Sequence, residues 1–80
     1  MERPITIEVK TNIQGMPLNI KLNGEIERIT KIYQQWIVSD RIISEDTVNK
    51  YFMVRTNQSR VYDIYHESIS NVWYIDRVHQ

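Results

Sequence analysis

The sequence predicts an all-β domain, a small antiparallel barrel or curled sheet of about six short strands. Near the N-terminus, apolar and polar residues alternate strictly over residues 5–10, which is the pattern of a strand with one buried face. In the last third of the chain, short polar connections separate three runs rich in Val, Ile and aromatic residues, at 50–56, 60–66 and 72–78. A flat sheet of this size would leave one face wet, so we expect the sheet to close or curl.

The first strand, at 5–10, is followed by a loop at 11–16 and a second strand at 18–22, which Pro17 opens. The residues of the first strand that we expect to face inward are Ile5, Ile7 and Val9. The apolar residues that alternate with polar ones in the second strand are Leu18, Ile20 and Leu22. Asn23-Gly24 then gives the strongest turn signal of the chain, that of a type I′ hairpin turn.

Residues 25–39 fit two structures. Their apolar residues recur at helical spacing, at Ile26, Ile29, Tyr33, Trp36 and Ile37. A helix at about 25–38 would make the fold α+β. The many β-branched side chains and the preceding Asn-Gly turn favour strands instead, and a bulge near Lys31 would produce the same spacing. We therefore expect strands here, followed by a polar loop at 40–49 in which 44–47 can form a helical turn.

The register of the next hairpin follows from its three-residue loop, Asn57 to Ser59. This loop sets Val54 opposite Tyr62 and Phe52 opposite Ile64, whereas a loop one residue shorter or longer would place Asp63 opposite Phe52 and bury a carboxylate. An even-length connection at 68–71 then brings the last strand into the same pattern. The predicted core residues of this meander are Phe52, Val54, Tyr62, Ile64, Trp73 and Ile75. Six short strands with brief connections best fit an SH3-like barrel.

Length and composition exclude several functions. Eighty residues predict one domain, 1–80, which has no room for a deep pocket with its walls, so we do not expect an enzyme. The absence of cysteine excludes a disulfide framework and a Cys-based zinc site. We expect no catalytic residues, no metal and no cofactor. Without a signal-type N-terminus or a run of about 20 apolar residues, the chain is expected to be cytoplasmic, with no membrane contact.

The face of the meander opposite the core carries the candidate binding surface. Aromatic residues interleaved with arginine can anchor a protein interface or stack nucleic-acid bases. The candidate residues are Tyr51, Arg55, Tyr65, Tyr74, Trp36 and Arg60. A purely structural role, the cross-strand pairing of tyrosines, is the alternative for the sheet face. Trp36 also belongs to an apolar cluster, with Ile37, Ile42 and Ile43, that can close one end of the barrel or offer a patch for association.

Charge decides between partner classes. Ten basic residues balance ten acidic ones, and each half of the chain is balanced too. Nucleic-acid binding rests on phosphate neutralisation by Lys and Arg. We therefore expect a non-enzymatic binding module that docks a protein partner, or itself, through the aromatic face. The alternative is an accessory domain that binds single-stranded nucleic acid.

The order of residues resembles a small uncharacterised bacterial domain, DUF6504. The resemblance covers most of the chain and rests on Pro4-Ile5, residues 18–24, Trp36, Asp40-Arg41, Tyr51 and Trp73-Tyr74-Ile75. That family has no assigned activity, and some members accompany proteins related to Y-family translesion DNA polymerases. The resemblance thus implies a link to DNA repair by association. Ile42-Ile43 departs from the pattern, because the family often places a Trp pair there, and this removes an aromatic surface.

Overall fold

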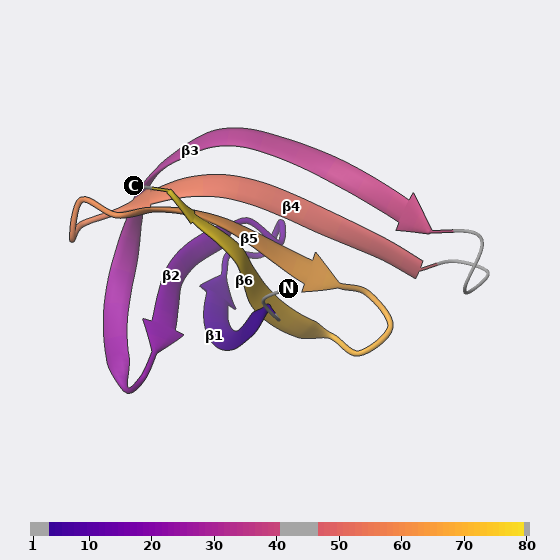
Figure 1. The fold of residues 1–80 in the computed structure, drawn as a ribbon, viewed down its shortest axis with the longest axis horizontal. Coiled ribbons are helices and arrows are strands. Elements are labelled where there is room, and N and C mark those ends of the chain that lie inside the picture. The colour runs from indigo at the N-terminus through magenta and orange to yellow at the C-terminus, as the bar shows by residue number, and fades with distance from the viewer. Residues whose placement is uncertain (1–3, 41–46, 80) are drawn as a thin grey trace.

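The computed structural model describes residues 4–40 and 47–79. It is a closed antiparallel barrel in which each strand pairs with the next and the first pairs with the last (Figure 1). The strands are β1 (Ile5–Thr11), β2 (Pro17–Leu22), β3 (Glu25–Asp40), β4 (Thr47–Thr56), β5 (Val61–Glu67) and β6 (Val72–His79). The predicted all-β class is confirmed, and the architecture is consistent with a small SH3-like barrel. No helix that could cross a membrane occurs in the described part of the chain.

The alternative of a helix at about 25–38 is wrong, because this stretch is one 16-residue strand, β3. The register of β3 against β4 shifts twice, between Ile29 and Lys31 and between Ile32 and Gln34. Each shift inserts one extra residue and moves the following side chains to the other face. Two such bulges give the apolar residues of a strand an apparent helical spacing. The predicted bulge near Lys31 is therefore confirmed.

Each of the four turns that join described strands contains a residue with positive φ, and two of these turns were predicted in detail. Asn23 and Gly24 have φ of 52° and 81°, which is the type I′ turn that their sequence predicted. Between β4 and β5, the predicted three-residue loop is closed by a 2.8 Å hydrogen bond from the Thr56 amide to the Arg60 carbonyl. Ser59, with φ of 58°, occupies the left-handed position that glycine often takes in such loops.

The predicted register of the meander is confirmed. Phe52 pairs with Ile64, Val54 with Tyr62, and Ile64 with Ile75. The buried core consists of Ile7, Ile20, Phe52, Val54, Tyr62, Ile64 and Ile75. Five of the six predicted core residues of the meander belong to it, and the sixth, Trp73, packs against it while partly exposed. A register shift between Asp63 and Ile64 accommodates an extra residue in β6.

The first two strands close the barrel. β1 pairs with β6 from Ile5↔Ile75 to Ile7↔Trp73, and β2 joins β1 to β3. Ile7 is buried, but Ile5 at the end of the barrel is half exposed, so it is not the core residue that its alternation predicted. Leu18 is also exposed, because the register of β1 against β2 shifts at Lys10/Thr11 and leaves it out of the ladder.

The loop expected at 40–49 is shorter than predicted, because β3 continues to Asp40 and β4 begins at Thr47. The possible helical turn at 44–47 and the apolar residues Ile42 and Ile43 fall wholly or mainly outside the described residues.

A buried carboxylate lies on the inner face of β3. Glu27 is almost fully buried, and Thr56 Oγ1 donates to its Oε1 at 2.7 Å. Tyr62 Oη donates to Oε2 at 3.1 Å, and the guanidinium of Arg60 donates to the same oxygen at 3.0 Å. The carboxylate therefore takes the place of an apolar residue in this layer, with each oxygen hydrogen-bonded.

Candidate protein-docking surface

Four aromatic rings form one row across the outer face of the barrel. The strand registers place Trp36 opposite Tyr51, Tyr51 opposite Tyr65, and Tyr65 opposite Tyr74. Their ring centroids are 5.3, 4.7 and 5.0 Å apart, with interplanar angles of 15°, 25° and 26°. This row, called the aromatic row below, spans β3, β4, β5 and β6 at one level of the sheet. It brings together four of the six candidate residues.

The rings of the aromatic row stack face to face, so they stand on edge above the sheet. Both faces of the Tyr51 ring and of the Tyr65 ring are occupied by neighbouring rings. As a result Tyr65 is only 8% exposed although it lies on the outer face. A ligand that needs an open ring face, such as a nucleic-acid base, has none on these two tyrosines. Within the row, Trp36 has one ring neighbour, Tyr51, and its other face is turned toward the outer side of β3.

Acidic residues lie beside the aromatic row. Burial, assisted by the charges of Tyr51, Asp76 and other neighbours, raises the pKa of the Tyr65 phenol to about 12. Burial, and then the charge of Asp76, also raises the pKa of Tyr51. The middle of the row is therefore a partly buried environment with a negative charge nearby, which does not favour phosphate.

The two candidate arginines lie away from the row. Arg55 is on the outer face of β4, opposite Lys31 and Val61, and is four residues, about 13 Å, along the strand from Tyr51. Arg60 is half exposed in the β4–β5 turn, where its guanidinium pairs with buried Glu27. The hydrogen bond to Tyr62 and the charge of Glu27 raise the pKa of Arg60 further. Neither arginine is therefore adjacent to the rings of the aromatic row.

The strand that ends the aromatic row has an open edge. β3 pairs with β2 only over residues 25–28, whereas it pairs with β4 as far as Asp40. Among the described residues, the second half of β3 therefore has a strand partner on one side only. In Figure 1 this half runs along the upper margin of the molecule, with β4 beneath it. The backbone groups on the outer side of this edge are available to another strand.

The open edge lacks the features that normally protect one. Natural edge strands carry lysine, proline or bulges that discourage pairing. The two bulges of β3 end at Gln34, and residues 32–39 contain no charged residue and no proline. Three of their apolar side chains are exposed, Tyr33, Ile37 and Val38, and Ile37 reaches 62%. Residues 34–39 of β3, which include Trp36, are called the β3 edge below.

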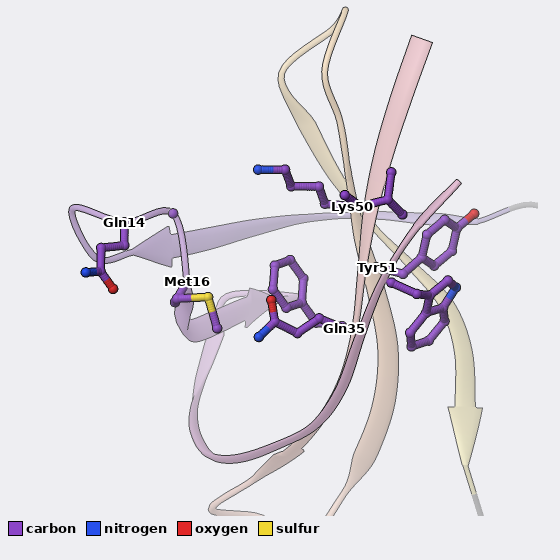
Figure 2. A pocket seen from close by; sticks show the side chains of 9 residues that line it. Gln14, Met16, Gln35, Lys50 and Tyr51 are labelled. Carbon is purple, nitrogen blue, oxygen red and sulfur yellow. The ribbon is translucent and has the colours of Figure 1, made fainter. Parts of the chain in front are cut away.

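A groove lies between the β3–β4 strand pair and the β1–β2 loop. Its volume is about 690 Å³, and the β1–β2 loop at 14–16 faces residues 35–37 and 50–52 across it. Figure 2 shows Gln14 and Met16 on one side of this hollow, and the Tyr51 ring on the far side of its strand. A smaller hollow of about 260 Å³ adjoins it and adds His66, Asn71 and Trp73. His66 is held there by Asn71 Oδ1, 2.7 Å from its Nε2.

The described residues contain no set of three His, Cys, Asp or Glu side chains that could hold a metal ion. The second histidine, His79, pairs with Asp63 at 2.8 Å on the outer face. This pair is an isolated contact at the end of β6, with no third polar group bonded to either side chain among the described residues.

Comparison with known proteins adds no relative: no family model matches the chain, and neither a curated protein nor a solved structure shows significant similarity to it. The resemblance to DUF6504, with its implied link to DNA repair, stays a prediction.

Sequence reasoning placed the three tyrosines of the aromatic row on one face, but it assigned Trp36 to a separate apolar cluster and missed the β3 edge and the groove. The uncharged run at 32–39 is visible in the sequence, but it marks an edge only once the end of the β2–β3 pairing is known. The groove depends on the β1–β2 loop folding back toward β4, which no local pattern specifies.

Proposed function

We propose that this chain is a protein-binding module that takes up an extended strand of its partner on the β3 edge. The observation that carries the proposal is the uncharged, one-sided edge of β3 beside Trp36. An added strand would continue the sheet through backbone hydrogen bonds, which is a common mode of peptide recognition.

Trp36 supplies the side-chain anchor in this mode of binding. It is the terminal ring of the aromatic row, and Tyr51 fixes its orientation from one side. A tryptophan held in place loses little conformational freedom on binding, and tryptophan is enriched among residues that dominate interface energies. Exposed Ile37 and Val38 extend the apolar contact to both faces of the added strand.

The same geometry disfavours the nucleic-acid alternative. The inner rings of the aromatic row offer no open face, Asp76 lies beside them, and Arg55 and Arg60 are elsewhere. The net charge of zero provides no general attraction for phosphate.

The test is selection of random peptides of about ten residues, the length of a long strand, against the purified chain. Enriched peptides are then titrated against the double variant Gln34→Lys/Val38→Lys, which places lysines on the exposed outer side of the β3 edge. The matched control is Ile26→Lys/Gln58→Lys, which adds the same charge at exposed positions outside the edge.

We expect the wild type and the control to bind equally and the edge variant to lose at least about tenfold in affinity. Amide exchange in the complex should slow over residues 34–39. Peptides that bind the edge variant as tightly as the wild type would refute the proposal. So would binding of single-stranded DNA that weakens steeply with salt and ignores the edge substitutions.

A further inference from the structure

We propose that the strand taken up by the β3 edge is β3 of a second copy, paired antiparallel with Trp36 on the two-fold axis. This inference rests on the proposed function and names its partner. It starts from the aromatic row, which ends at β3 with one Trp36 face turned toward the unpaired side of the strand.

The spacing of the row suits such a continuation. Neighbouring rings already stack with centroids 4.7–5.3 Å apart, as their strands dictate. A strand added to β3 would lie at the same interval of about 4.8 Å. A tryptophan opposite Trp36 would therefore meet the ring face that points away from Tyr51 at stacking distance, and the two rows would join into one that crosses both copies.

The choice of register follows from the alternation of side chains. Directly opposite residues in an antiparallel pair share a face, so the two-fold axis of a symmetric pair passes midway between one residue and the same residue of the other copy. An axis at residue 36 sets Trp36 against itself, Gln35 against Ile37, and Gln34 against Val38. Moving the axis one residue either way sets Trp36 against Gln34 or Val38 and loses the stacked indoles.

Charge places no obstacle in the way of self-pairing. The paired segment, residues 33–39, carries no formal charge, so no like charges meet across the axis. The chain as a whole is neutral, which removes long-range repulsion between copies. A foreign strand has to bring its own complement to Trp36, whereas a second copy carries it already.

The first experiment measures association by light scattering on size-exclusion chromatography over a range of concentrations. We expect a dimer that Trp36→Ala weakens at least about tenfold. The register predicts a pair of opposite results for two double variants. Gln34→Lys/Val38→Lys places lysine opposite lysine twice and should be monomeric. Gln34→Lys/Val38→Glu places lysine opposite glutamate twice and should stay dimeric.

The second experiment uses the absence of cysteine from the chain. Gln34→Cys and Val38→Cys are prepared separately, mixed, and equilibrated in a glutathione buffer. We expect the mixed disulfide to exceed both homodisulfides, since residue 34 faces residue 38 of the other copy while identical positions lie about 13 Å apart along the strand. Both variants keep Trp36.

Three outcomes would overturn the inference. A folded wild type that stays monomeric at its solubility limit excludes the second copy, and if selected peptides still bind the β3 edge, the proposed function survives. A dimer in which homodisulfides dominate excludes this register. So does a dimer that persists in both Gln34→Lys/Val38→Lys and Gln34→Lys/Val38→Glu. A chain that neither dimerises nor binds peptides at the edge refutes the inference and the proposed function together.

Discussion

The carboxylate of Glu27 lies 2.7 Å from the hydroxyl of Thr56 inside the barrel, and it also accepts hydrogen bonds from the phenol of Tyr62 and the guanidinium of Arg60. These contacts join β3, β4, β5 and the β4–β5 turn through one side chain. The buried carboxylate thus connects the strands at the end of the barrel opposite the open β3 edge.

Replacing Glu27 should destabilise the fold strongly. Glu27→Ala leaves the buried hydroxyls of Thr56 and Tyr62 without an acceptor, and we expect a loss of about 2–4 kcal/mol in the free energy of unfolding. Urea unfolding followed by circular dichroism measures it. The control is Glu25→Ala, an exposed carboxylate in the same strand, with an expected change within about 0.5 kcal/mol. Equal effects of the two substitutions would contradict a structural role for the cluster.

Alkaline pH should destabilise the protein through Tyr65. The pKa of its phenol is raised to about 12 in the folded state, chiefly by burial, whereas an unfolded tyrosine titrates near its ordinary value of 10. Between these values the unfolded state binds fewer protons than the folded state. The contribution of Tyr65 to the free energy of unfolding is therefore fully present below pH 10 and is lost as pH rises toward 12. The slope attributable to this group is at most about 1.4 kcal/mol per pH unit.

Tyr65→Phe keeps the stacked ring and removes the titrating group, so its stability should decline less steeply above pH 10. Some decline is expected to remain, because burial also raises the pKa of Tyr51 and Tyr62. Urea midpoints at several alkaline pH values, with tyrosinate absorbance as a second readout, measure both slopes. Identical slopes for the wild type and the variant would show that Tyr65 is not the group responsible.

The β4–β5 turn offers a stabilising substitution. Ser59 has φ of 58°, a conformation that costs an L-residue about 1 kcal/mol and glycine almost nothing. Ser59→Gly should therefore raise the free energy of unfolding by about 0.5 kcal/mol after the added chain entropy of the unfolded state. Gln58→Gly, one residue earlier and without positive φ, should lower it. Thermal melts compare the pair, and changes of the same sign would contradict the backbone argument.

The fold was largely predictable because each local pattern agreed with the others. The three-residue loop and the parity of Phe52, Val54, Tyr62 and Ile64 allowed a single register that buried no carboxylate opposite Phe52. The spacing within β3 stayed ambiguous, since two bulges imitate a helical period until the partner strand is known. Glu27 escaped sequence analysis altogether, because a buried glutamate is recognisable only through partners that are distant along the chain.

The candidate site was predictable only in part. The register that set Tyr51 opposite Tyr65 followed from the sequence, and the stacked pair is where parity placed it. Arg55 lies on the same outer face of β4 as Tyr51, as parity predicted, but four residues along the strand from it. Arg60 pairs with buried Glu27, which the sequence did not indicate. Neighbouring rings cover both faces of Tyr51 and Tyr65. This covering depends on side-chain orientation, which the order of residues does not specify.

A double-mutant cycle separates stacking within the aromatic row from simple burial. Tyr51 and Tyr65 are opposite each other with centroids 4.7 Å apart, so the effects of Tyr51→Ala and Tyr65→Ala on unfolding should be non-additive by about 0.5–1.5 kcal/mol. The control cycle pairs Tyr51→Ala with Trp73→Ala, because the Trp73 ring lies tilted against Phe52 on the opposite face of the sheet. Its two effects should add within about 0.5 kcal/mol.

Coupling confined to Tyr51 and Tyr65 would mean that the middle of the row stabilises the barrel and holds Trp36 in place, so that binding energy is concentrated at the β3 edge. Additive effects in both cycles would mean that the rings act independently. In that case Trp36 would lack the fixed orientation on which its role as an anchor depends, and substitution of Tyr51 would leave peptide binding and self-association at the β3 edge unchanged.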